Sequence, residues 1–158
     1  MSLNIGDSIP KFSLVNYDKE KYESKDSLGR KTMFVFMPFP FSSVCDGEIC
    51  ELRDNLDSFK SAETDTVMIT VAARPTNEAW AKHNQIEFPI LADFWPHGEV
   101  SKMFGCFNEG AGISLRYTYI TDENNVITEI IKSDEIGVER DFPVSYTHLT
   151  LPTKSRGV

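Results

Sequence analysis

The sequence predicts an α/β fold in which helices flank a central mixed β-sheet. Short apolar runs, typical of buried strands, alternate with stretches whose apolar residues recur every three or four positions, as they do on one face of a helix. A hairpin pattern follows this alternation, and it adds antiparallel strands to the parallel ones. With 158 residues, 41% of them hydrophobic and 25% charged, the chain has the size and composition of one globular domain.

The first part of the chain contains two predicted strands and one long helix. Residues 12–15 form a short strand candidate, and residues 32–37 (TMFVFM) are nearly all apolar, as in a strand buried on both faces. A helix is expected from about residue 44 to residue 60. Its apolar stripe consists of Ile49, Leu52, Leu56 and Phe59.

The second part repeats the alternation and then ends in the hairpin. The expected elements are a buried strand at 67–72 (VMITVA), a helix capped by Thr76 that runs to about Asn84, a strand at 88–91, a short helix at 99–104 that Gly105 ends, and strands at 116–121 and 126–131 around a polar turn. No internal repeat or low-complexity linker interrupts the pattern.

Charge and hydropathy exclude several classes of partner. Lysine and arginine number 16 against 24 aspartates and glutamates, a net charge of −8. This charge argues against a nucleic-acid or anionic-membrane partner. No apolar run approaches the 18 or so residues of a membrane span, and the N-terminus has no signal-peptide pattern. Three cysteines without an export signal favour a reducing, cytoplasmic location over a disulfide scaffold.

The C-terminal residues differ from the rest. Segment 144–153, VSYTHLTLPT, resembles the in-frame translation of a sequencing-library adapter, and it has no amphipathic pattern. We therefore expect a domain at 1–143 and a non-native tail at 144–158, so that the domain lacks its native C-terminal helix. A natural irregular tail is the alternative.

The segment around Cys45 carries the strongest chemical signal. Pro38 and Pro40 end the buried strand and restrict the loop, and Ser42 and Ser43 are N-cap candidates for the long helix. Cys45 then lies in the first helical turn, where backbone N–H groups and the helix dipole stabilise an anion. This position favours a reactive thiolate. The alternative is a buried cysteine that acts only as a small hydrophobe, which is how we interpret Cys106, in its apolar setting.

Cys50 follows Cys45 by five residues on the same helix. Five helical steps separate the two Cα atoms by about 8.6 Å and turn the side chains about 140° apart. Because a disulfide needs Cα atoms within about 7 Å, the two thiols can join only if the first turns of the helix unwind. The spacing also differs from that of a CxxC redox pair or a zinc site. A passive role for Cys50 is the alternative.

Pro38, Ser42 and Cys45 have the spacing of the peroxiredoxin active-site motif: a proline, three residues, a threonine or serine, two residues and a cysteine. The chain resembles this family over most of residues 3–141. Segments 93–98, 107–109 and 111–113 are most similar to the AhpE-type branch. Arg116 and Glu48 lie where the family has its active-site arginine and a supporting glutamate.

The resemblance implies a thioredoxin-like fold and a role for each of these residues. Cys45 is then the peroxidatic cysteine, and Pro38 shields it from solvent. Ser42 hydrogen-bonds the peroxide, Arg116 holds both thiolate and peroxide, and Glu48 is the supporting glutamate. Glu48 either orients Arg116 or is only a charge near the helix start that the dipole favours. The implied activity is thiol-dependent reduction of hydrogen peroxide, organic hydroperoxides and peroxynitrite, often in a homodimer.

Two positions depart from the AhpE-type pattern. Ser42 replaces the commoner threonine and lacks the methyl group that restricts the rotamer. Cys50 is unusual in that branch, and it matches the resolving cysteine of the Q-type (bacterioferritin-comigratory) branch. Recycling therefore proceeds either through Cys50 or through direct attack of an external thiol on the oxidised Cys45.

The chemistry needs no metal, flavin or nucleotide, and the sequence has no phosphate-binding glycine loop. The partners expected are the peroxide and a thioredoxin-like or low-molecular-weight thiol reductant. Two other functions remain open from the residues. One is a thiol–disulfide oxidoreductase, which the absence of CxxC disfavours. The other is a non-enzymatic redox sensor or binding module that uses Cys45 and Cys50 as a switch.

Overall fold

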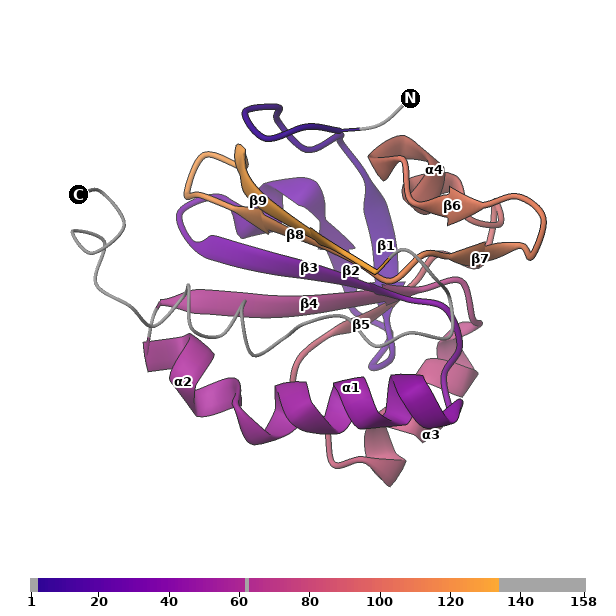
Figure 1. The fold of residues 1–158 in the computed structure, drawn as a ribbon. Coiled ribbons are helices and arrows are strands. Elements are labelled where there is room, and N and C mark those ends of the chain that lie inside the picture. Colours follow the sequence, from indigo (N-terminus) through magenta and orange to yellow (C-terminus); the bar gives the residue numbers. More distant parts are fainter. Residues whose placement is uncertain (1–2, 62, 134–158) are drawn as a thin grey trace.

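The computed structural model describes residues 3–61 and 63–133. Its centre is a seven-stranded sheet in the order β2-β1-β5-β4-β3-β8-β9 (Figure 1). Strands β3, β4 and β5 run parallel, whereas β1, β8 and β9 join the sheet antiparallel. The seven strands are β1 (Ser13–Asn16), β2 (Lys21–Glu23), β3 (Lys31–Met37), β4 (Thr64–Thr70), β5 (Ile90–Ala92), β8 (Tyr117–Thr121) and β9 (Ile127–Lys132). The prediction of a mixed α/β sheet is confirmed.

Helices cover both faces of this sheet. Helices α1, α2 and α3 lie on one face, below the sheet in Figure 1, and α4 lies on the other. The helices are η1 (Ser24–Ser27, a 3-10 turn), α1 (Ser43–Asp54), α2 (Leu56–Ser61), α3 (Arg74–His83) and α4 (Glu99–Phe104). Because β3, α1, β4, α3 and β5 follow one another in the same direction across the sheet, right-handed crossovers place α1 and α3 on one face.

The core has two layers because side chains alternate along each strand. In β3, Met33, Val35 and Met37 face the α1–α3 layer, and Phe34 and Phe36 face the α4 layer. All five side chains are fully buried. The apolar run at 32–37 was therefore correctly predicted as a strand buried on both faces.

The helix predicted from 44 to 60 is two helices. Asn55 ends α1 with φ −105° and ψ 9°, outside helical geometry, and α2 begins at the next residue. The side-chain Nδ2 of Asn55 donates to the Glu51 carbonyl at 2.8 Å. An asparagine side chain that bonds a backbone carbonyl competes with the helix, which explains the break.

The predicted cap of the following helix was also wrong. Helix α3 begins at Arg74 with Ala73 as its N-cap, and Thr76 lies inside the first turn. Pro75 explains the earlier start, because a proline in the first turn has its φ already set for a helix and no N–H to leave unsatisfied.

Three short strands were not predicted. Strand β2 pairs with β1 at one edge of the sheet, and β6 (Phe107–Asn108) pairs with β7 (Ile113–Ser114) in a separate two-stranded sheet. Strands of two or three residues are too short to show a periodic pattern. The predicted tail at 144–158 and the boundary after residue 143 lie outside the described residues. In the part of the chain that the structure describes, no helix combines the length and apolar character needed to cross a membrane.

Candidate active site

The candidate site forms where β3 passes into α1. Strand β3 ends at Met37, a loop follows, and Ser42 is the N-cap of α1 in an extended conformation. Cys45 is the third helical residue, so the prediction that it lies in the first turn is confirmed. Phe41 has a φ of +68°, a conformation unusual for a bulky side chain. Its ring lies against those of Trp80 and His83, with centroids 6.5 and 5.9 Å away, which holds the strained turn in place.

Cys45 is fully buried and belongs to the core layer under α1. The backbone N–H of Phe39 donates to its Sγ at 3.5 Å. Pro38, next in the chain to Phe39, is buried as well. The Ser42 hydroxyl donates to the Phe39 carbonyl at 3.1 Å. The loop before α1 therefore encloses the thiol and directs a backbone donor at its sulfur, an arrangement that favours negative charge there.

A buried ion pair lies one turn further along the same helix. Glu48 and Arg116 are 0% and 2% exposed, and Arg116 Nη1 donates to Glu48 Oε1 at 2.6 Å. The same nitrogen lies 3.9 Å from Met37 Sδ, at the end of β3. Residues three apart are neighbours on a helix surface, so Glu48, which holds Arg116, lies next to Cys45 on α1. The structure thus joins two predicted residues that are 68 positions apart.

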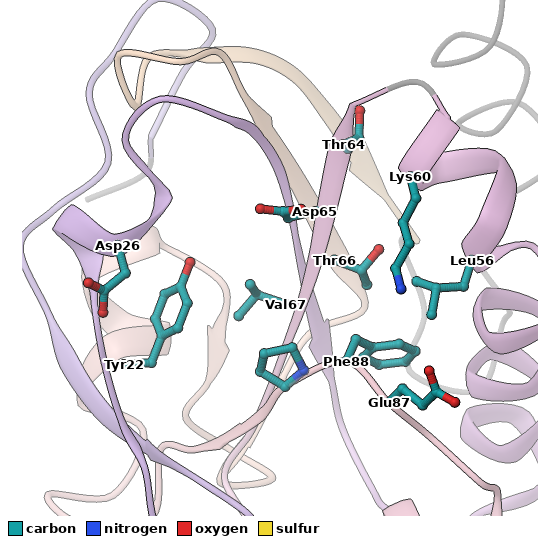
Figure 2. A pocket seen from close by; sticks show the side chains of 11 residues that line it. Tyr22, Asp26, Leu56, Lys60, Thr64, Asp65, Thr66, Val67, Glu87 and Phe88 are labelled. Carbon is teal, nitrogen blue, oxygen red and sulfur yellow. The ribbon is translucent and has the colours of Figure 1, made fainter.

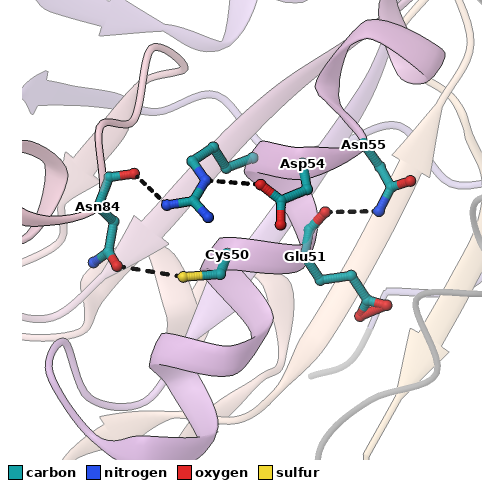
Figure 3. A network of polar contacts seen from close by, with 6 residues as sticks. Cys50, Glu51, Asp54, Asn55 and Asn84 are labelled. Carbon is teal, nitrogen blue, oxygen red and sulfur yellow. Dashed lines mark hydrogen bonds and ion pairs between the residues drawn. The ribbon is translucent and has the colours of Figure 1, made fainter.

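Cys50 lies in a different environment from Cys45. It is half-buried, and its Sγ donates to Asn84 Oδ1 at 3.4 Å (Figure 3). Helix α1 is continuous over both cysteines, and neither forms a disulfide. The helical geometry keeps the two thiols apart, as the spacing predicts.

Sequence reasoning missed two residues that contact α1, one in α3 and one directly after it. Trp80 is fully buried, and its Nε1 donates to Asp46 Oδ1 at 2.6 Å. Asn84, which follows α3, contacts Cys50 and also accepts a bond from Arg53 Nη1 at 3.0 Å through its backbone oxygen. The sequence predicted this helix, but which side chains of α1 it meets depends on how the two helices cross.

A comparison with protein families identifies the chain. Residues 5–130 match the model of the AhpC/TSA family. The chain belongs to this family, which is that of the peroxiredoxins. The peroxiredoxin resemblance and the expected thiol-dependent peroxidase function are therefore confirmed, and neither the sensor nor the oxidoreductase alternative is favoured.

Two curated relatives show which peroxiredoxins this chain is similar to. Alkyl hydroperoxide reductase E of Mycobacterium tuberculosis is 38% identical over 126 residues, which cover 79% of this chain and 82% of the relative. Peroxiredoxin Bcp of Escherichia coli is 30% identical, with 73% of this chain and 72% of the relative covered. Similarity to both agrees with the mixture of AhpE-type segments and Q-type cysteine spacing in the sequence.

Solved structures confirm the thioredoxin-like fold. AhpC of Enterococcus faecalis superimposes with a TM-score of 0.87 and 22% identity, covering 100% of this chain and 95% of that chain. Peroxidoxin BcpB of Mycobacterium tuberculosis superimposes with a TM-score of 0.77 and 21% identity, covering 84% of this chain and 88% of that chain.

The third cysteine of this peroxiredoxin lies on the opposite face of the sheet. Cys106 is fully buried in the α4 layer, which confirms that it is a core residue. Burial, and to a smaller extent the neighbouring Cys106, raises the pKa of Tyr119.

A cleft of about 240 Å³ does not belong to the peroxiredoxin site (Figure 2). It lies at the start of β4, where Thr64 pairs with Lys31 at the start of β3. The other end of β3, which Cys45 follows, is about 20 Å away at 3.3 Å per strand residue. The side chains that line the cleft include Tyr22, Lys60, Thr66 and Phe88.

Proposed function

We propose that Cys45 is the peroxidatic cysteine, and that the substrates are hydrogen peroxide, organic hydroperoxides and peroxynitrite. The observation that carries this proposal is the placement of a fully buried Cys45 in the first turn of α1, with the Phe39 N–H directed at its sulfur. A thiolate is the nucleophile that peroxide chemistry needs, and a helix start with a backbone donor favours it.

The reaction is a two-electron transfer at one sulfur. The Cys45 thiolate attacks one peroxide oxygen, an S–O bond forms, and the O–O bond breaks with its electron pair on the leaving oxygen. That oxygen takes a proton and departs as water or alcohol. Cys45 is oxidised to sulfenic acid and the peroxide is reduced.

Pro38 and Ser42 act on the approach of the peroxide. Pro38 excludes water from the sulfur, which strengthens every electrostatic interaction there. The Ser42 hydroxyl donates to Phe39 O, so its oxygen lone pairs can accept a hydrogen bond from the peroxide O–H. Because Cys45 is enclosed, we infer that the peroxide enters by displacing the half-exposed side chains of Phe39 and Phe41.

Arg116 and Glu48 provide the fixed charges of the site. As the O–O bond breaks, negative charge grows on the leaving oxygen, and a pre-oriented guanidinium stabilises it. Glu48 orients Arg116 through their 2.6 Å bond and compensates a cation that burial alone disfavours. Glu48 is in this proposal a positioning residue, and Arg116 contacts the reacting atoms.

We propose Cys50 as the resolving cysteine. After local unwinding of α1, its thiol attacks the Cys45 sulfenic acid, an S–S bond forms and water leaves. A thioredoxin-like protein or a low-molecular-weight thiol then reduces the disulfide by thiol exchange. The Q-type spacing and the partial exposure of Cys50 support this role, and direct attack by a small thiol on the sulfenic acid is the competing route.

We also propose that the protein is a cytoplasmic homodimer. Phe94 and Trp95 follow β5, and Phe39 and Phe41 follow β3. Because β3 and β5 are parallel, their carboxyl ends lie at one edge of the sheet. Trp95 is 82% exposed and the other three side chains are about half exposed. Such an apolar surface supports a contact between two copies, and three cysteines outside disulfides support a reducing compartment.

The test is an intact-mass measurement on prereduced protein that receives one equivalent of hydrogen peroxide, with and without a sulfenic-acid trap. A trap adduct mapped to Cys45 is expected, and without the trap a loss of two hydrogens that links Cys45 to Cys50. A trap adduct on Cys45, with no disulfide when the trap is left out, would contradict the resolving role of Cys50 and favour resolution by an external thiol. No rapid mass change in folded protein would overturn the assignment of Cys45.

A further inference from the structure

Helix α3 and the residue that follows it, Asn84, contact α1 at the two places that disulfide formation must disturb. Trp80 Nε1 donates to Asp46 in the first turn, at 2.6 Å, and Asn84 accepts from Cys50 at 3.4 Å. Arg53 adds a bond to the Asn84 backbone oxygen at 3.0 Å. These five residues are called the α1–α3 contact below. Since Cys45 and Cys50 can join only when α1 unwinds between them, the α1–α3 contact opposes that motion from outside the helix.

Asn84 is the centre of this contact, and its orientation is determined by its bonds. It is 6% exposed, and its Nδ2 donates to the Trp80 carbonyl at 3.0 Å. A carbonyl can only accept, so this bond places the amide nitrogen toward α3 and the amide oxygen toward α1. The amide oxygen can also only accept. The bond between Asn84 and Cys50 is therefore made by the thiol S–H of Cys50 (Figure 3).

We propose that Asn84 is a positioning residue for the resolving step, which holds the Cys50 thiol against α3 until Cys45 has been oxidised. This inference rests on the proposed two-cysteine reaction. When α1 unwinds, Cys50 leaves Asn84, and its thiolate attacks the Cys45 sulfur. The S–S bond forms, the S–O bond of the sulfenic acid breaks, and the oxygen leaves as water with the thiol proton.

The strength of the α1–α3 contact then decides between two fates of the sulfenic acid. Opening of the contact leads to the Cys45–Cys50 disulfide, which a thiol can reduce. While the contact stays closed, a second peroxide can oxidise the sulfenic acid to sulfinic acid, and the second peroxide is itself reduced to water or alcohol. Weakening the contact is expected to favour the disulfide.

The direct test is the alkylation of Cys50 in fully reduced protein, without peroxide. Iodoacetamide is added at fixed pH and the modification of Cys50 is followed by peptide mass mapping. Loss of one hydrogen bond in Asn84→Ala is expected to raise the alkylation rate about 2- to 10-fold. Asn84→Asp keeps an oxygen acceptor for the thiol but loses the Nδ2 bond to the Trp80 carbonyl, so its rate is expected to lie between those of the natural chain and Asn84→Ala.

Asn55 offers a matched control for Asn84→Ala. Both asparagines follow a helix, and both donate Nδ2 to the carbonyl four residues earlier, Asn55 to Glu51 at 2.8 Å (Figure 3). Asn55→Ala thus removes the same kind of capping bond without removing a bond to Cys50. The rate in Asn55→Ala is expected to match that of the natural chain. Equal acceleration in Asn84→Ala and Asn55→Ala, or a rate in Asn84→Asp as high as that in Asn84→Ala, would overturn the proposal.

A second measurement tests the role of Asn84 during the reaction with peroxide. After a series of peroxide doses, the masses of disulfide and sulfinic products are compared between Asn84→Ala and the natural chain. The ratio of disulfide to sulfinic product is expected to rise several-fold in Asn84→Ala, and an unchanged or lower ratio contradicts the proposal. Absence of any oxidation at Cys45 would instead contradict the proposed function and leave the alkylation result standing, so the two failures are distinguishable.

Discussion

The two faces of the sheet each hold a fully buried cysteine and a nearly fully buried carboxylate, but the partners of these groups differ between the faces. On the α1 face, Cys45 receives a backbone N–H, and Glu48 is paired with the cation of Arg116. On the α4 face, Cys106 lies in an apolar layer. The carboxylate there, Asp93, accepts from the backbone N–H of Val100 and Ser101 and from the Ser101 hydroxyl.

The difference teaches that burial by itself does not identify a reactive group. Both thiols are 0% exposed, and a buried cysteine is most often an inert small hydrophobe. Cys45 differs from Cys106 in its position at a helix start, in its backbone N–H donor and in the Glu48–Arg116 ion pair on the same helix, and these features support the proposed reactivity. Among the described residues, the donors to the carboxylate on the α4 face are neutral, and their bonds have a structural effect: they tie the start of α4 to the loop after β5.

The largest expected difference between the faces is in activity. Cys45→Ser is expected to lower the rate of peroxide consumption by at least about 10³-fold, because removal of a nucleophile abolishes its covalent step. Cys106→Ser is expected to keep activity within a few-fold, provided that the variant is folded. The measurement is peroxide consumption with dithiothreitol as reductant. Equal losses in the two variants would erase the distinction between the two thiols.

The next difference is in stability. Glu48→Ala leaves the Arg116 guanidinium buried without its carboxylate, which is expected to cost about 3–5 kcal/mol of unfolding free energy. Asp93→Asn leaves no opposite charge behind and is expected to cost less, about 1–3 kcal/mol. Urea unfolding of the two variants and the natural chain measures both values. A cost for Glu48→Ala below that of Asp93→Asn contradicts the interpretation of the ion pair.

The smallest expected difference is in pH dependence. Burial raises the pKa of the Asp93 carboxyl above its usual value, although the hydrogen bonds from Val100 and Ser101 oppose this shift. The folded chain therefore holds this proton more tightly than the unfolded chain. The stabilisation that comes from binding this proton is complete below the unfolded pKa of about 3.9. It is lost as the pH rises through the folded pKa.

Comparison of Asp93→Asn with the natural chain isolates this effect, since asparagine does not titrate. As the pH falls toward 4, the natural chain is expected to gain unfolding free energy relative to the variant. Urea unfolding at several pH values between 4 and 7 provides the measurement. The prediction is contradicted if the difference in unfolding free energy between the two chains stays constant across this range, or if it shifts in favour of the variant at low pH.

Much of the fold and of the site could be predicted from the sequence because the signals are local. The strand at 32–37 and the short helix Glu99–Phe104 have strong patterns, and both were predicted to within one residue. The placement of Cys45 follows from a strand, two prolines and a serine cap. The association of Glu48 with Arg116 came from family resemblance, because no periodicity relates residues 68 positions apart.

The parts that could not be predicted depend on tertiary contacts or on single side chains. Asn55 breaks the long helix through one side-chain bond, which the apolar stripe on both sides of it conceals. Trp80 and Asn84 meet α1 only because of the way α3 packs across it. Nothing in the sequence around the indole of Trp80 or the amide of Asn84 indicates which partner it bonds.

The position of β1 in the sheet has a consequence for synthesis on the ribosome. Asn16 of β1 pairs with Leu91 of β5, and its side chain accepts a bond from the backbone N–H of Ile90. The N-terminal hairpin thus leaves the ribosome about 75 residues before the strand that it must join. At about 5–20 residues per second, the nascent chain exposes this strand edge for roughly 4–15 s. During that time the unpaired edge is open to other nascent chains and to chaperones.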